Sequence, residues 1–197
     1  MNNMKLKSIL VATCMLIAGA IYAQDNSARL TFRVGTGIPG AGVQYFVQGL
    51  NNYNYGLSAV YSDYYSDTKT TPAICAEGYY ICNEWLRAGL DLAYTKYSNE
   101  CFDGISGQLK KERKGQSLAV LPTAMVFYYQ KDFIRLYTSL GMGLGYYSGF
   151  DNMTGNLAFE VQFIPIGIEV GNRVFGFAEG GMGTAVSWVR CGVGFKF

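Results

Sequence analysis

Residues 187–197, SWVRCGVGFKF, decide the fold because their side chains alternate between two kinds. Counted back from the end, every second residue is apolar: Phe197, Phe195, Val193, Cys191 and Val189. The residues between them are small, charged or indole-bearing: Lys196, Gly194, Gly192, Arg190 and Trp188. This period of two predicts a β-strand with one apolar face. Chain ends usually fray into polar tails, so an apolar strand here indicates pairing within a sheet.

Similar alternation recurs along the chain, least clearly after Leu118, and we expect all-β structure with eight antiparallel strands. They begin near Leu30, Ala73, Leu86, Leu118, Ile134, Ala158, Val174 and Ser187. The tract 41–66 could supply another hairpin around Asn51, which would make ten strands. A change in the parity of the apolar residues beside Pro165 predicts a β-bulge.

The connections between these strands alternate in length. Those after Cys82, Gln130 and Val170 are short, whereas residues 98–116 and 148–156 form longer polar segments. Short turns at one end and long loops at the other are typical of a transmembrane up-and-down β-barrel. Aromatic residues near the strand ends are consistent with two interfacial rings. They are Tyr79, Tyr80, Trp85, Tyr128, Tyr129, Phe133, Phe195 and Phe197 near the short turns, and Tyr94, Tyr97, Tyr146 and Tyr147 near the loops.

Two orientations of the apolar face are possible. With the apolar face inward, the chain would be a soluble barrel of the lipocalin kind. That barrel would expose a run of strand glycines to water, which weakens strands without compensation. They are Gly141, Gly143, Gly145, Gly192 and Gly194. We therefore predict the inverted barrel, with glycines and charges inside and apolar residues facing lipid.

The front of the chain has the pattern of an export signal. Lys5 and Lys7 precede an apolar run too short to cross a bilayer as a helix, and small residues follow it up to Ala23. We expect residues 1–23 to be a signal peptide and residues 24–197 to be one barrel domain. The 25 glycines and 16 tyrosines favour β structure. Without the signal peptide the positive and negative charges balance, which gives no indication of nucleic-acid binding.

Three segments carry a resemblance to a known family: EGYYICNEWLRAGLDLAYTKYS from Glu77, PIGIEVGNRVFGFAEGGMG from Pro165, and the terminal VGFKF. With the signal peptide, they resemble the small porin-family outer-membrane β-barrels of Gram-negative bacteria, relatives of the OmpA and OmpX barrels. The resemblance implies an outer-membrane location and a chain end read by the barrel-assembly machinery, a role that would fall to Phe195 and Phe197.

The polar faces of the predicted strands carry equal numbers of acidic and basic residues. They are Arg33, Arg87, Arg135 and Arg190, with Glu77, Asp91, Glu160 and Glu179. The interior of an eight-stranded barrel is filled by side chains, so we expect these residues to form a paired network that plugs the lumen. The alternative is a narrow porin or transporter for small solutes.

The sequence offers little for catalysis. The chain has no histidine, so Ser139 and Ser187 lack the usual base of a hydrolase. A hydrolase that uses carboxylates alone, such as Glu77 opposite Asp91, is a second alternative. The motif GTGIPG from Gly35 lacks the helix that a dinucleotide site requires, and we interpret it as a turn. We expect no catalytic residue, cofactor or metal site.

Two further features bear on partners. Lys110, Lys111, Arg113 and Lys114 lie together in a predicted outer loop, where they could contact the phosphates of lipopolysaccharide. The pairing of Cys75, Cys82, Cys101 and Cys191 is left open by their spacing. The overall expectation is a monomeric, non-enzymatic outer-membrane barrel with a structural or surface-interaction role, surrounded by outer-membrane lipids and lipopolysaccharide.

Overall fold

The structure is a computed structural model that describes residues 30–40, 64–65, 69–103, 106, 108–148 and 155–197. These residues form ten strands: β1 (Leu30–Pro39), β2 (Tyr64–Tyr65), β3 (Lys69–Thr70), β4 (Ala73–Ile81), β5 (Leu86–Phe102), β6 (Leu109–Lys131), β7 (Ile134–Tyr147), β8 (Asn156–Gly171), β9 (Val174–Gly183) and β10 (Val186–Lys196). In this part of the chain no helix is long and apolar enough to cross a membrane. The predicted signal peptide and most of the tract 41–66 lie outside the described residues.

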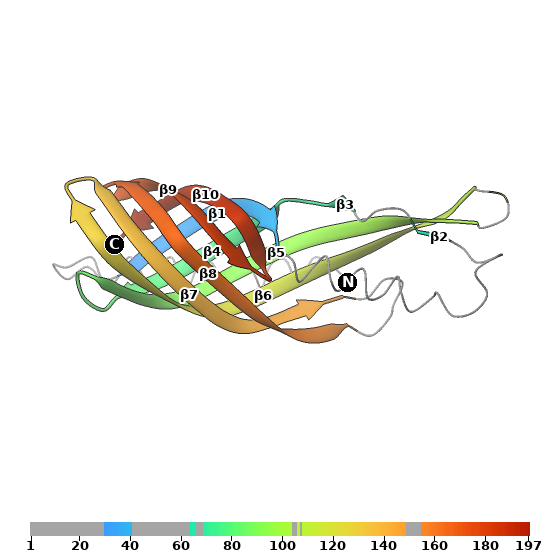
Figure 1. Cartoon of the computed structure of the whole chain (residues 1–197), viewed down its shortest axis with the longest axis horizontal. Helices are drawn as coiled ribbons and strands as arrows, with labels where there is room; N and C mark the ends of the chain where they lie inside the picture. Colours follow the sequence, from blue (N-terminus) through green and yellow to red (C-terminus); the bar gives the residue numbers. More distant parts are fainter. Residues whose placement is uncertain (1–29, 41–63, 66–68, 104–105, 107, 149–154) are drawn as a thin grey trace.

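Eight of the strands close into one antiparallel barrel (Figure 1). Each strand pairs with its neighbour in the order β1, β4, β5, β6, β7, β8, β9 and β10. The terminal strand β10 closes the barrel by pairing with β1, with Phe195 opposite Phe32 and Val193 opposite Val34. The two short strands, β2 and β3, pair only with β5. The prediction of an all-β antiparallel barrel with eight strands is therefore confirmed.

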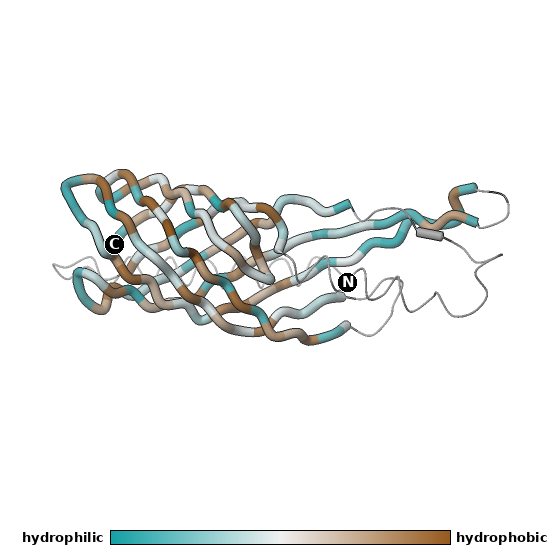
Figure 2. The backbone as a smooth tube through the Cα atoms, in the orientation of Figure 1, coloured by the Kyte–Doolittle hydropathy of each residue, from teal (hydrophilic) through white to brown (hydrophobic). Residues whose placement is uncertain are grey.

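The predicted register of the hairpin between β4 and β5 is also confirmed. Glu77 lies opposite Asp91, and Gly78 lies opposite Leu90. Because side chains alternate across a strand, Glu77 and Asp91 are buried in the interior while Leu90 and Leu92 are exposed. Figure 2 shows apolar residues along the strands of the barrel.

The predicted bulge beside Pro165 is confirmed. A second bulge, on β10, shows that the prediction of an inward Trp188 is wrong. The pairing of β8 with β9 shifts between Phe163 and Ile166. On β10, the register with β1 shifts between Gly37 and Ile38. Trp188, which the alternation placed on the inner face, has a positive φ of 62° and is 70% exposed. The extra residue turns the indole outward beside Val189.

One predicted loop is instead a ribbon. β5 and β6 pair from Leu86 and Val126 to Phe102 and Leu109, so most of the segment 98–116 is strand. This ribbon projects past the rim of the barrel, away from the short turns (Figure 1). Most of its residues are polar, and its apolar residues Cys101, Phe102 and Leu109 lie near its tip. Apolar alternation, the signal used to find the other strands, is therefore absent from it.

The prediction that all these aromatic residues lie at the two membrane interfaces is partly wrong. Tyr80, Trp85, Tyr128, Tyr129, Phe133 and Tyr146 are exposed as expected. Tyr79, Tyr97 and Tyr147, by contrast, are at most 2% exposed. Each lies on the inner parity of its strand, so these three rings fill the interior.

Candidate functional site: the charged interior of the barrel

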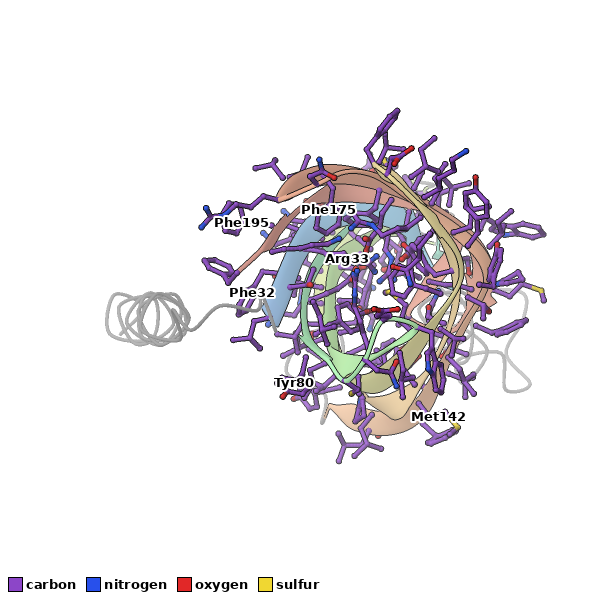
Figure 3. All side chains as sticks on the ribbon, turned by 90° about the vertical axis from the view of Figure 1, so that its left-hand side faces the viewer. Phe32, Arg33, Tyr80, Met142, Phe175 and Phe195 are labelled. Carbon is purple, nitrogen blue, oxygen red and sulfur yellow. The ribbon has the colours of Figure 1, made fainter. Side chains whose placement is uncertain are left out.

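Nine charged side chains from seven strands meet inside the barrel. They are Arg33, Glu77, Arg87, Asp91, Arg135, Glu169, Glu179, Arg190 and Lys196. We call this set the interior network. Each sits on the inner parity of its strand, and Arg33 points into the lumen in the view along the barrel (Figure 3). In the same view Met142 and Tyr80 point away from it.

The first layer of the network is centred on Arg33 and Arg190. Arg190 Nη1 lies 2.5 Å from Asp91 Oδ2 and 3.1 Å from Glu77 Oε1, and its Nε donates to Glu179. Arg33 donates to Glu77 and lies 2.7 Å from Glu179 Oε1. These two arginines thus bridge three carboxylates contributed by β4, β5 and β9. The layer ties four successive pairs of barrel strands together.

The second layer surrounds one carboxylate, Glu169. Arg87 Nη1 lies 2.8 Å from Glu169 Oε1. Arg135 Nε and Lys196 Nζ lie 3.3 Å and 3.6 Å from Oε2. Arg33 Nη1, at 3.8 Å from Oε1, links this layer to the first. Four cations therefore share a carboxylate that is fully buried.

Aromatic rings hold the arginines in place. The Arg33 guanidinium lies 4.3 Å from the centre of the Phe177 ring, and that of Arg87 lies 4.1 Å from the centre of Phe127. Tyr137 also takes part through its hydroxyl, which accepts from Arg33 at 2.6 Å and donates to Glu179 at 2.5 Å. Cations stacked on aromatic rings are stabilised where water is excluded.

The interior beyond the first layer is packed with small apolar side chains. They are Ala73, Cys75, Ala93, Ala119, Leu121, Ala185 and Val186. A hollow of about 10 Å³ lies beside Gln162, Glu179 and Arg190, which is room for about one water molecule. Side chains thus occupy the lumen beyond the first charged layer.

The structure brings together seven of the eight residues predicted for this network. The eighth, Glu160, is 1% exposed but accepts a hydrogen bond from the Tyr147 hydroxyl. Among the described residues no cation lies within ion-pair distance of it. Glu160 is therefore a buried carboxylate outside the interior network.

Sequence reasoning missed Glu169 and Lys196. The parity change at Pro165 was recognised, and it places Gly167 and Glu169 on the inner face once Ile166 and Ile168 point outward. Lys196 shares the inner parity of β10 with Arg190. Both residues could have been found by carrying the alternation past the bulge and to the end of the chain.

The other predicted sites are placed differently. Lys110, Lys111, Arg113 and Lys114 lie on β6 in the projecting ribbon, where alternation divides them between two faces. Lys114 is also paired, 3.0 Å from Glu112. Beside the ribbon, Lys69 on β3 donates a hydrogen bond to Glu100 of β5, which raises the pKa of the Lys69 ammonium.

The predicted assembly residues lie at the opposite end. Phe195 and Phe197 are in edge contact, with ring centres 4.5 Å apart, and Phe32 packs against Phe197 at 5.6 Å. Figure 3 shows Phe32 and Phe195 on the outside of the wall. These rings form an aromatic group beside the seam where β1 and β10 close the barrel.

The chemistry available to the site is limited. Among the described residues no group of three side chains is placed to hold a metal ion. Cys75 and Cys191 are free thiols on opposite faces of the wall, the first buried and the second exposed. Glu77 and Asp91 both contact Arg190, which leaves neither carboxylate placed as an isolated base.

The chain matches no protein-family model, and no curated protein matches it.

Arg190 gives a direct test of the network. Replacing it with Met removes the cation shared by Glu77, Asp91 and Glu179 and leaves three buried carboxylates with one remaining arginine. We expect the free energy of unfolding to fall by about 3–5 kcal/mol. Urea unfolding of the refolded protein in detergent micelles measures this. Arg173→Met, at an exposed position outside the network, is the matched control. If both variants lost the same free energy of unfolding, the contribution of the network to stability would be contradicted.

Substitutions of Glu160 and Glu179 should have different effects on the free energy of unfolding. Glu160→Gln removes a buried charge that lacks a cation and keeps an acceptor for Tyr147, so stability should stay the same or rise. Glu179→Gln deprives Arg33 and Arg190 of a charged partner and should cost about 1.5–3 kcal/mol. The same urea titration compares the two variants. A larger loss in Glu160→Gln would show that Glu160 has a role in stability that its contacts do not explain.

Proposed function

We propose that this chain is an outer-membrane β-barrel protein whose barrel spans the bilayer with a sealed lumen. Its role is structural or consists of surface interactions made through the projecting end, and it performs no catalysis. It acts as a monomer, because the strands of one chain close the barrel without a partner.

The observation that carries this proposal is the distribution of apolar and charged residues across the wall. The outer face exposes large apolar side chains along the strands, including Met142 at 53%, Leu144 at 57% and Phe159 at 64%. The charged residues lie inside. A protein in water gains stability from the reverse arrangement, and an apolar surface this extensive is stable only against lipid or another apolar partner.

The outer membrane is the membrane that suits this arrangement. The predicted signal peptide directs the chain out of the cytoplasm, and closed barrels of this size are typical of bacterial outer membranes. In that setting the short turns face the periplasm and the ribbon of β5 and β6 faces outward. Phe195 and Phe197 would then be available to the barrel-assembly machinery as the last strand enters the bilayer.

The projecting ribbon supports a surface role. It carries Lys110, Lys111, Arg113 and Lys114 beyond the apolar part of the barrel, where lipopolysaccharide phosphates lie. Figure 2 shows the change from the apolar barrel to a ribbon that is hydrophilic along most of its length. Glu112 lies among these cations and pairs with Lys114, so any phosphate contact competes with that pair.

Met142 tests whether the outer face meets lipid. At mid-strand in a bilayer, Met142→Arg should lower the free energy of unfolding by about 2–4 kcal/mol, because the charge must leave water. Leu109→Arg is the control: Leu109 is 58% exposed but lies on the ribbon, so its substitution should be nearly neutral. Urea titration in phospholipid vesicles gives both values. If Met142→Arg were as mild as Leu109→Arg, the outer face would not lie in hydrocarbon.

Conductance distinguishes a sealed barrel from a narrow porin. In planar bilayers the purified protein should give current no higher than the protein-free background, because paired charges and packed side chains fill the lumen. Incorporation must be verified on the same bilayer by protease protection or antibody labelling. If steady single-channel currents were observed, the sealed-lumen proposal would be wrong and the narrow porin would be favoured.

A further inference from the structure

An open hollow of about 430 Å³ lies at the short-turn end of the barrel. It is lined by Arg135, Asn172, Arg173, Lys196 and Phe197, and we call it the short-turn mouth. The three cations come from three separate places: the start of β7, the turn between β8 and β9, and the end of β10. The fold therefore gathers positive charge around one opening.

The charges of the interior network do not balance at this end. The layer around Glu169 holds Arg87, Arg135 and Lys196 against a single carboxylate, an excess of two positive charges. The other layer holds two arginines against three carboxylates, so it cancels only one of these. Arg173 adds a further positive charge at the mouth.

The excess charge lies where water screens it poorly. The side chains of Arg135 and Lys196 are only 13% and 11% exposed. Both pack over the Phe175 ring, at 5.7 Å and 5.1 Å from its centre. The Arg135 Nη2 group also donates to the Gly171 carbonyl at 2.5 Å, which fixes its direction. Partly buried cations without enough partners are stabilised by a bound anion.

We propose that the short-turn mouth binds a phosphate group. A phosphate carries up to two negative charges and can present oxygens to all three cations of the mouth, whereas a carboxylate has one charge and two oxygens. The Arg135 guanidinium and the Lys196 ammonium would contact its oxygens from the lumen side, and Arg173 and the Asn172 amide from the turn. The phosphate comes either from solution or from a phospholipid headgroup. This inference does not depend on the proposed function, since it concerns one end of the barrel in any environment.

The test uses the whole mature chain refolded in zwitterionic detergent micelles. Inorganic phosphate is titrated against chloride at constant ionic strength while backbone amides are followed by NMR. We expect saturable shifts at Asn172, Arg173 and Lys196 with phosphate and not with chloride. Asn172→Asp, which is nearly isosteric, should weaken the apparent affinity at least about tenfold by placing a negative charge in the mouth. Lys196→Gln should also weaken it.

Asn83→Asp is the matched control, because Asn83 lies in another turn at the same end and accepts hydrogen bonds through the oxygen that aspartate keeps. It should leave the affinity unchanged. A second arm places the protein in phosphatidylcholine nanodiscs with or without phosphatidic acid. A response to phosphate alone supports a soluble source, and a response only to phosphatidic acid supports a headgroup. No saturable response in either arm, or equal binding by Asn172→Asp, would overturn the proposal.

Discussion

A charge inside a narrow closed barrel must be met by an opposite charge, and this requirement governs the structure. Water cannot solvate the fully buried side chains of Arg33, Glu77 and Glu169, so each relies on ion pairs and hydrogen bonds from facing strands. These contacts join β1, β4, β8 and β9 across the lumen. Once they form, the strand alternation leaves the outer face to the apolar residues.

Small residues make this interior possible. Gly194 lies against the Phe175 ring, where an added Cβ would approach to 2.3 Å, and Gly167 lies equally close to the Tyr137 ring. The aromatic rings that support the cations thus occupy space that neighbouring side chains would otherwise fill. Inner glycines and inner aromatics are complementary parts of one packed core. The excess of positive charge at the short-turn end is what the proposed phosphate site would neutralise.

Alternation predicted most of the barrel strands, because most of them separate a polar inner face from an apolar outer face. It was least clear on β6, whose inner face carries Ala119, Leu121 and Met125. It failed where a second effect intervened. The extra residue at Trp188 reverses the face of the indole, and the bulge at Pro165 hides the inner position of Glu169 from a simple count. The ribbon was missed because most of its residues are polar, which leaves no apolar alternation to follow. Tyr97 and Tyr147 were misplaced because a tyrosine near a strand end suits either side of the wall, and only its parity decides.

The central claim is that the apolar face meets lipid while the charges meet one another. Cys191 tests it most directly, since it is exposed on the outer face, paired with Ala178 in mid-wall. A nitroxide on Cys191, with the other cysteines replaced by alanine, is examined by power-saturation EPR in phospholipid bilayers. The account predicts much greater access for dissolved oxygen than for a water-soluble nickel complex. A label on Lys114→Cys, on the projecting ribbon, is the reference for a site in water. If the nickel complex reached Cys191 as readily as that label, the account would be contradicted.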